Sequence, residues 1–413
     1  MKGRSRLRTA VRILSVLLVL AALGASGEIA FRCWPRKLYL ATPKPVETVQ
    51  VREGRPAVTV PGRILLGELA KFDDGLFAYL MFDYYRSRDA LENAQVTLTS
   101  EEEGDKPVYH VRVRLVDDVI NGVTRLAELK ASGLTASVQF QWVGQDRFAR
   151  DLQQTSVFIK AYENPSTRRL EDLHARELHA YLLRFIRFKS LTDPRMQTAT
   201  EMVPSPLSPK EASRLAADII AVSSFYGIPL DMFIGIAAME NNYMSVPGDL
   251  TNTAWKRRPE PGDVVLERRR HRVLVWNHSI GVWQITRQSL RYAHRLYLSD
   301  KRDYAELPER LRPPKVLDVD NVDPAVLTTY AGLLLRDLLD RFHGDVTKAV
   351  GAYNGGYRTP NLQYAAGVQM VADYARRVIG HAAELKDAKI SNTAVDHRVV
   401  KPEKSVKEKR NSS

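Results

Sequence analysis

The pattern of apolar and polar positions divides the chain into regions of different character. Between residues 39 and 191, stretches in which apolar and polar residues alternate are interleaved with stretches in which apolar residues recur every third or fourth position. The first period is typical of strands and the second of helices. Residues 109–115 and 138–142 predict strands, whereas residues 64–94 and 170–188 predict helices. We therefore expect a small mixed α/β domain here. It contains no catalytic motif, and a role in binding glycan or protein is left open.

A change of pattern follows a segment with the composition of a linker. Residues 192–207 are rich in Pro, Ser and Thr. The sequence Ser-Pro-Lys-Glu beginning at Ser208 then predicts a helix start, because Ser208 can cap the helix and Glu211 can complete a capping box. Gly227 should end this helix. A second helix over residues 229–239 is apolar on most sides, so we expect it to be buried.

Glu240 stands near the C-terminal end of this second helix. A carboxylate in apolar surroundings is costly unless it is paired or neutral. Burial disfavours the anion and raises the pKa, which allows a glutamate to act as a general acid near neutral pH. The alternative is a solvated glutamate at a frayed helix end, beside Asn241 and Asn242.

Two further short motifs follow Glu240 along the chain. The first contains a Gly-Val-Trp-Gln turn from Gly281 to Gln284, and the second is Ala-Tyr-Asn-Gly-Gly from Ala352 to Gly356. In order and residue type, the three motifs resemble those of the lytic transglycosylases with a goose-type lysozyme fold, which cut the glycan strands of peptidoglycan. The resemblance covers roughly residues 208–380, and it implies a mainly α-helical, lysozyme-like catalytic domain over residues 208–385. The expected fold class of the whole chain is α+β.

The resemblance implies a mechanism with one acid. Glu240 would protonate the leaving oxygen of the MurNAc-GlcNAc β-1,4 bond and then take the proton of the muramic acid's own C6 hydroxyl. The product would carry a 1,6-anhydro end. Tyr353 would hydrogen-bond Glu240 and hold its carboxyl group toward the scissile oxygen. Ordinary retaining and inverting glycoside hydrolases instead need two carboxylates, one to donate a proton and one to attack or to activate water.

The resemblance also implies a set of residues that bind the glycan. Gln284 would contact polar groups of the sugar, and Trp283 replaces a methionine of the family pattern. Trp283 could stack on a sugar face or anchor the core. Gly281, Ser279 and Asn354 would complete the lining of the cleft.

An insertion separates Glu240 from the second motif. Within residues 247–277, two apolar stretches flank the basic run 267–272, which predicts a hairpin with a basic tip. This tip could form a cationic wall suited to the carboxylates of peptide stems, or it could be a solvated loop. The insertion also holds the candidate second acids, which are Asp249, Glu260 and Asp263.

The two ends of the chain bear on its location. Residues 1–38 hold a basic start and an uncharged run, which predicts either a cleaved secretory signal or a retained inner-membrane anchor. We therefore expect export to the periplasm or cell envelope. The single cysteine, Cys33, excludes an intrachain disulfide. Residues 386–413 predict a basic, flexible tail.

The formal net charge of +13 and the pI near 9.6 favour polyanionic partners. In an exported protein these are peptidoglycan and the membrane surface rather than nucleic acid, and protein partners are left open. Alternatively, much of the excess charge belongs to the N-terminal targeting segment and the C-terminal tail. The nine histidines lack paired ligand spacing, so no metal or cofactor is expected.

Three functions compete: a lytic transglycosylase, a lysozyme-like hydrolase that uses an acid of the insertion, and a non-catalytic wall-binding protein.

Overall fold

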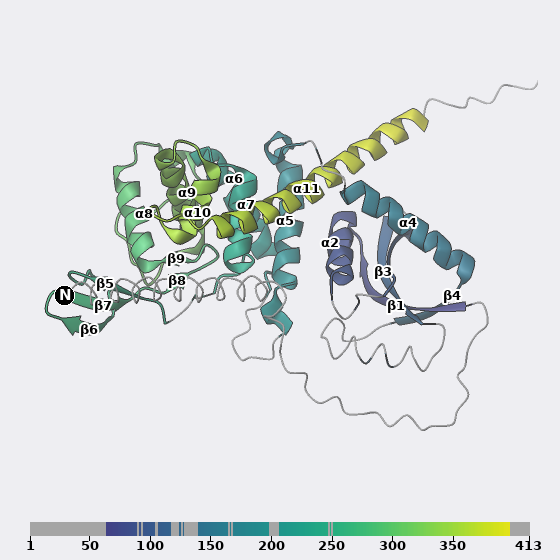
Figure 1. Cartoon of the computed structure of the whole chain (residues 1–413). Coiled ribbons are helices and arrows are strands. Elements are labelled where there is room, and N and C mark those ends of the chain that lie inside the picture. The colour runs from purple at the N-terminus through teal and green to yellow at the C-terminus, as the bar shows by residue number, and fades with distance from the viewer. Residues whose placement is uncertain are drawn as a thin grey trace, which may run out of the picture.

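The fold is known from a computed structural model of the chain (Figure 1). The residues that it describes are 63–88, 91, 94–103, 106–116, 124, 127, 139–163, 166, 168–197, 206–246, 248 and 251–396. The predicted signal or anchor at residues 1–38, with Cys33, lies outside them. Among the helices of the described residues, none combines the length and the apolar character needed to cross a membrane.

The N-terminal part is built on an antiparallel sheet of order β2-β3-β1-β4. Its elements in chain order are β1 (Arg63–Phe72), α2 (Gly75–Arg86), β2 (Val96–Glu103), β3 (Lys106–Val116), β4 (Gln139–Gly144) and α4 (Gln145–Glu163). The predictions of strands at 109–115 and 138–142 are confirmed by β3 and β4. Thr155 of α4 hydrogen-bonds both the N–H and the carbonyl of Leu98, so the helix covers the outer edge of β2.

The prediction of one long helix over residues 64–94 is wrong in its first part. Residues 63–72 form β1, which pairs with β3 on one side and β4 on the other. Leu65 and Leu66 are both buried because they pack on opposite faces of this central strand. A strand buried on both faces loses the alternation of apolar and polar residues and reads like a helix. The helix itself begins after Asp74, whose side chain caps the N–H of Phe77.

The C-terminal part is mainly helical. Its longer helices are α5 (Ala175–Leu191), α6 (Pro209–Tyr226), α7 (Leu230–Asn241), α8 (Arg287–Ser299), α9 (Pro324–Arg341), α10 (Val346–Gly355) and α11 (Leu362–Asp396). The shorter 3-10 turns are η2 (Leu170–Asp172), η3 (Pro194–Gln197), η4 (Tyr304–Glu306) and η5 (Glu309–Leu311). Helix α6 confirms the predicted start and stop: Ser208 and Glu211 form both bonds of a capping box, and Gly227 ends the helix with φ of 59°.

The insertion after α7 forms a three-stranded antiparallel sheet of order β5-β7-β6. The strands are β5 (Thr253–Lys256), β6 (Val265–Arg269) and β7 (Arg272–Trp276). The predicted hairpin with a basic tip is confirmed by β6 and β7, and β5 adds a strand that the pattern did not predict. The strands β8 (Ser279–Ile280) and β9 (Ile285–Thr286) form a short pair around the Gly-Val-Trp-Gln turn.

Helices α5 and α11 join the two parts: Figure 1 shows α5 between the N-terminal sheet and the other helices, and α11 running from those helices past α5 toward α4. One continuous set of buried apolar side chains runs from β1 to the end of the described side chains of α11. Tyr374 of α11 donates a hydrogen bond of 3.0 Å to Asp83 of α2. The described residues therefore form an α+β fold with a shared core.

The prediction of a flexible tail from residue 386 is wrong for residues 386–396, because α11 continues to Asp396. This segment holds no Gly or Pro, and several of its residues favour helix. Residues 397–413 lie outside the described part of the chain.

Candidate active site

Glu240 lies on the last turn of α7, a helix that is buried along most of its length. The helix ends at Asn242, which takes a left-handed conformation with φ of 45°. Glu240 itself is only half-buried, whereas Ile236 and Ala237 in the turn before it are fully buried. The carboxyl group is thus placed where an apolar helix reaches the surface.

Tyr364, on the first turn of α11, donates a hydrogen bond of 2.7 Å to Oε1 of Glu240. The two helices run antiparallel and approach closely at two glycines. A Cβ atom on Gly235 would lie 2.7 Å from the carbonyl oxygen of Val368, and one on Gly367 would lie 2.9 Å from Cε of Met239. This close approach brings Tyr364 opposite Glu240.

Burial raises the pKa of Glu240 from 4.5 to about 7, and the hydrogen bond from Tyr364 opposes this rise. No Lys, Arg or His side chain of the described residues forms an ion pair with Glu240, so no cation stabilises the anion. Near neutral pH the carboxyl group therefore exists in both protonation states. A group with this property can donate a proton in one step and accept one in the next.

Tyr353 occupies a different position from the one the resemblance implies. Its hydroxyl donates a hydrogen bond of 3.1 Å to the carbonyl of Trp283, so the expected hydrogen bond to Glu240 is wrong. Tyr353 still lies near the carboxyl group. Burial, and after it the charge of the nearby Glu240, raises the pKa of its phenol. Tyr353 therefore connects α10 to the Gly-Val-Trp-Gln turn, beside Glu240.

Trp283 is fully buried, and its indole stacks on Phe233 of α7 with a ring separation of 4.1 Å. Its Nε1 donates a hydrogen bond of 3.0 Å to Thr328 of α9. The reading of Trp283 as a stacking surface for sugar is therefore wrong, and the alternative reading as a core anchor is confirmed. The residue holds the turn against the helix that carries Glu240.

The polar residues of the turn bind to one another. Gln284 has φ of 46°, and its Nε2 donates to the carbonyls of Val246 and Gly281 while its Oε1 accepts from Ser279. Gly281 has φ of 72°, and a Cβ atom there would lie 2.7 Å from Leu327. The side-chain amide of Gln284 thus ties the loop after Glu240 to the turn, and only its remaining hydrogen-bonding capacity is left for a ligand.

Asn354 is exposed at the C-terminal end of α10, where its Oδ1 accepts a hydrogen bond of 2.9 Å from Asn361. Asn361 also caps α11 by accepting from the N–H of Tyr364 at 3.0 Å. A Cβ atom on Gly355 would lie 2.7 Å from the backbone nitrogen of Asn361, so Gly355 permits this approach. The third motif therefore fixes the start of the helix that carries Tyr364.

The loop after Glu240 is held by residues that sequence reasoning placed in a linker. Asp193 accepts hydrogen bonds from Arg195 and from the side chain of Asn242, and Arg195 also reaches the carbonyl of Asn241. Burial acts against the anion of Asp193, but these hydrogen bonds hold its pKa below the usual range. The linker composition of this segment gave no signal of the role.

The acids of the insertion lie in strongly cationic surroundings. Asp263 has a side chain that is 1% exposed and accepts hydrogen bonds from Lys256 and Arg291. Burial opposes ionisation, yet these bonds and one from the backbone N–H of Glu260 lower its pKa. Glu260 also pairs with Lys256. Asp249 lies outside the described residues.

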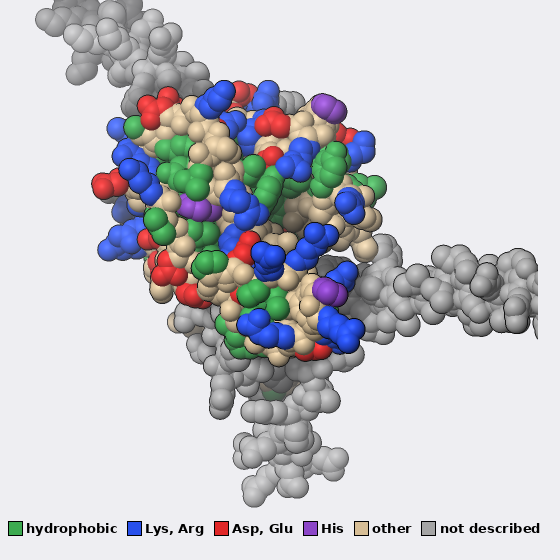
Figure 2. All heavy atoms as spheres, turned by 90° about the vertical axis from the view of Figure 1, so that its left-hand side faces the viewer, with side chains coloured by type: hydrophobic (Ala, Val, Ile, Leu, Met, Phe, Trp, Pro, Cys, Tyr) green, Lys and Arg blue, Asp and Glu red, His purple; other side chains and the backbone are tan. Residues whose placement is uncertain are grey.

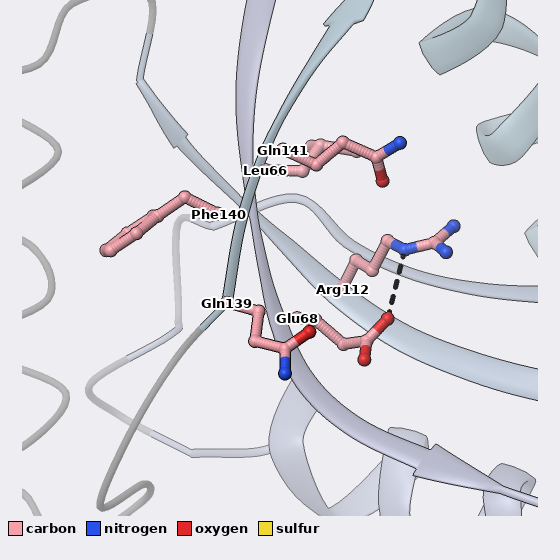
Figure 3. A pocket seen from close by; sticks show the side chains of 6 residues that line it. All are labelled: Leu66, Glu68, Arg112, Gln139, Phe140 and Gln141. Atoms are coloured by element: carbon pink, nitrogen blue, oxygen red, sulfur yellow. Dashed lines mark ion pairs between the residues drawn. The ribbon is translucent and has the colours of Figure 1, made fainter.

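A separate shallow cavity of about 200 Å³ lies on the N-terminal sheet (Figure 3). It is lined by Leu66, Glu68, Arg112, Gln139, Phe140 and Gln141. Arg112 pairs with Glu68 at 3.6 Å, and the ring of Phe140 points away from this pair. The cavity contains none of the predicted site residues, and its charges compensate each other.

Comparison with known proteins gives no relationship: no family model and no curated protein sequence matches the chain. The geometry around Glu240 is therefore the basis for any functional conclusion.

Proposed function

We propose that the protein is an exported peptidoglycan lytic transglycosylase that cleaves the MurNAc-GlcNAc β-1,4 bond and leaves 1,6-anhydro-muramoyl ends. The observation that carries the proposal is the state of Glu240: a half-buried carboxyl group with a pKa of about 7, one tyrosine donor and, among the described residues, no cation. The order of the three motifs and the mainly helical fold of the C-terminal part support it.

In the proposed mechanism, Glu240 acts first as acid and then as base. Oε1 accepts the hydrogen bond from Tyr364, so the transferable proton is carried by Oε2. This proton passes to the glycosidic oxygen as its bond to C1 of the muramic acid breaks. The resulting carboxylate then accepts the proton of the C6 hydroxyl, while O6 forms the new bond to C1. An intramolecular nucleophile competes well with water because it acts at high effective molarity.

The environment of Glu240 suits both steps. A pKa near the working pH balances the tendency to give a proton against the tendency to take one. Tyr364 fixes the orientation of the carboxyl group, and Tyr353 holds the neighbouring turn through the Trp283 carbonyl. In this proposal Glu240 is the catalytic residue, while Tyr364 and Tyr353 are positioning residues.

A lysozyme-like hydrolase is the second candidate, and it would need another carboxylate. The buried acid Asp263 is held by Lys256 and Arg291, and Glu260 pairs with Lys256. These cations stabilise the anions but occupy the oxygens that would activate water. The charge environment of the described acids in the insertion thus favours the single-acid mechanism.

Mass spectrometry of peptidoglycan digested with the full chain tests the proposal. We expect soluble fragments with 1,6-anhydro ends, and we expect none with the Glu240→Gln variant. Fragments with reducing ends would identify a hydrolase instead. The absence of soluble fragments, together with retained binding to peptidoglycan, would identify a non-catalytic wall-binding protein.

The proposed location follows from the N-terminal segment. Its basic start and uncharged run support export, with either cleavage or retention as an inner-membrane anchor. Detection of the mature N-terminus by mass spectrometry distinguishes the two outcomes.

A further inference from the structure

The inserted sheet β5-β7-β6 has two faces of opposite character. Val273 and Val275 are buried on the inner face, at 6% and 0% exposure. The strand register places Trp255 opposite Leu274, and Thr253 opposite Trp276. Because paired residues share a face and neighbours along a strand alternate, both tryptophans and Leu274 lie on the outer face.

The outer face exposes large apolar side chains among charged ones. Trp255 and Trp276 are 40% and 41% exposed. Two aliphatic residues of the same sheet region, Val264 and Leu266, are 45% and 46% exposed. Figure 1 shows the sheet at the end of the molecule away from β1 to β4. Several large apolar side chains on one small sheet are typical of an interaction surface.

Arginines without acidic partners lie along this sheet and at its hairpin tip. Among the described residues no ion pair involves the exposed side chains of Arg257, Arg258, Arg268, Arg270 or Arg272. The hairpin register also places Arg269 directly opposite Arg272, which is unfavourable for two like charges. Figure 2 faces this end and shows Lys and Arg side chains beside hydrophobic ones over its lower part. Such a surface is complementary to a dense array of anions.

The surroundings of Trp255 distinguish between a sugar and a lipid surface as the partner. The guanidinium of Arg269 lies 4.8 Å from the centre of the Trp255 ring and also pairs with Glu267 at 2.6 Å. One ring face is therefore already covered, which disfavours stacking on a sugar. At a lipid interface, by contrast, indole rings sit among headgroups while arginines extend to phosphates.

We propose that the outer face of β5-β7-β6 docks on an anionic phospholipid surface. Trp255 and Trp276 would enter the headgroup region, and the unpaired arginines would bind phosphate groups. This inference goes beyond the proposed cleavage reaction and does not depend on Glu240. It gives the inserted sheet a role in holding the protein at a membrane.

Quenching of tryptophan fluorescence by brominated lipids tests the proposal on the full chain. The relevant signal is the difference in emission between the wild-type protein and the Trp255→Phe/Trp276→Phe variant. Because this difference comes from Trp255 and Trp276, tryptophan in an N-terminal membrane segment does not contribute to it. With vesicles that contain phosphatidylglycerol, we expect this signal to be quenched at low salt and to recover as salt rises.

A triple variant with Gln at Arg268, Arg270 and Arg272 should lose most of the quenching. Each basic residue near an anionic membrane contributes roughly fivefold to binding, so three together contribute on the order of 100-fold. The matched control replaces Lys210, Lys301 and Lys315, which are exposed and lie outside the sheet, with Gln. The control should keep the quenching of the wild-type protein.

Three results would overturn the proposal. The first is a signal that no lipid quenches. The second is equal quenching in vesicles of phosphatidylcholine alone, since charge would then have no role. The third is a signal that responds to soluble peptidoglycan glycans and not to vesicles, which would make the face a sugar-binding surface. The salt dependence of the wild-type protein provides an independent check if a variant folds poorly.

Discussion

Two carboxyl groups of the C-terminal part experience burial with opposite results. Glu240 at the end of α7 has no cationic partner among the residues that the structure describes, and burial raises its pKa to about 7. Asp263 at the base of the inserted sheet is buried beside Lys256 and Arg291, and its pKa is lowered. Burial alone therefore does not make a general acid. The difference lies in the hydrogen bonds that Asp263 accepts from the backbone N–H of Glu260 and from Arg291 and Lys256, whereas Glu240 accepts one from Tyr364 and has no cation beside it in the part of the chain that the structure describes.

The largest expected effect is on catalysis, from Glu240→Gln. The amide keeps the shape of the carboxyl group but cannot transfer a proton. Loss of general acid catalysis typically lowers the rate by about 10²–10⁴-fold, and we expect the upper end because one group serves both proposed steps. The rate of release of soluble fragments from peptidoglycan measures this. Activity within a few-fold of the wild type would remove Glu240 from its proposed role.

The matching change at the other carboxyl group, Asp263→Asn, should affect stability. It leaves Lys256 and Arg291 without their buried partner, although Glu260 still compensates in part. Loss of one partner from a buried pair costs about 3–5 kcal/mol, and we expect the lower end. Urea unfolding measures the change. If Asp263→Asn instead abolished cleavage while the folding free energy stayed constant, the comparison between the two carboxyl groups would fail.

The pH dependence of stability provides a direct test of the state of Glu240. Its pKa is about 7 in the folded protein against 4.5 for the ordinary group. Between these values the folded state binds more protons than the unfolded state, so stability falls as pH rises through this window. Glu240→Gln removes this fall. We expect the variant to equal the wild type near pH 4 and to be more stable by about 1–3 kcal/mol near pH 8.

The measurement is urea unfolding of both proteins at several pH values. Asp263→Asn serves as the contrast, because the lowered pKa of Asp263 contributes stability that is lost as pH falls. An equal pH dependence in the wild type and Glu240→Gln would show that the carboxyl group ionises normally.

Tyr364→Phe tests the hydrogen bond that opposes the raised pKa. Without the donor, the anion of Glu240 is less stable, so its pKa should rise further. The rate should fall by roughly tenfold, because a hydrogen bond to a charged group contributes about 1.5 kcal/mol or more. The fall of activity at high pH should also move to higher pH. A lower rate with an unchanged pH profile would limit Tyr364 to a packing role.

The signals that the sequence provides are local ones, and the local predictions are the ones that the structure confirms. The cap at Ser208 and the stop at Gly227 each depend on a few adjacent residues. By contrast, the helix prediction for residues 64–72 is wrong because the burial of β1 comes from neighbours on both sides of the sheet. Helical periodicity at residues 64–72 contained no information about those neighbours.

The candidate site shows the same difference between local sequence signals and contacts between distant residues. The environment of Glu240 could be expected from the apolar helix before it, but its partner Tyr364 lies 124 residues further along the chain. Tyr364 reaches Glu240 only because Gly235 and Gly367 allow α7 and α11 to approach. Asn361 three residues before Tyr364 is a helix-start signal, yet it does not specify which helix lies opposite. The buried position of Trp283 likewise depends on its stacking against Phe233.

The smallest effect is expected for Tyr353→Phe, which sharpens the contrast between the two tyrosines. The change removes the donor to the Trp283 carbonyl and leaves the hydrogen bond from Tyr364 to Glu240 in place. A neutral hydrogen bond contributes about 1 kcal/mol, so we expect a similar loss of stability and a rate lowered only a few-fold. The pH profile of cleavage should stay at the wild-type position, because burial and Tyr364 govern the pKa of Glu240. Cleavage rates across pH, measured in parallel with Tyr364→Phe, separate the two roles. A shifted profile in Tyr353→Phe would place its hydroxyl on the carboxyl group during the reaction, and the connection to Trp283 would then describe only the free protein.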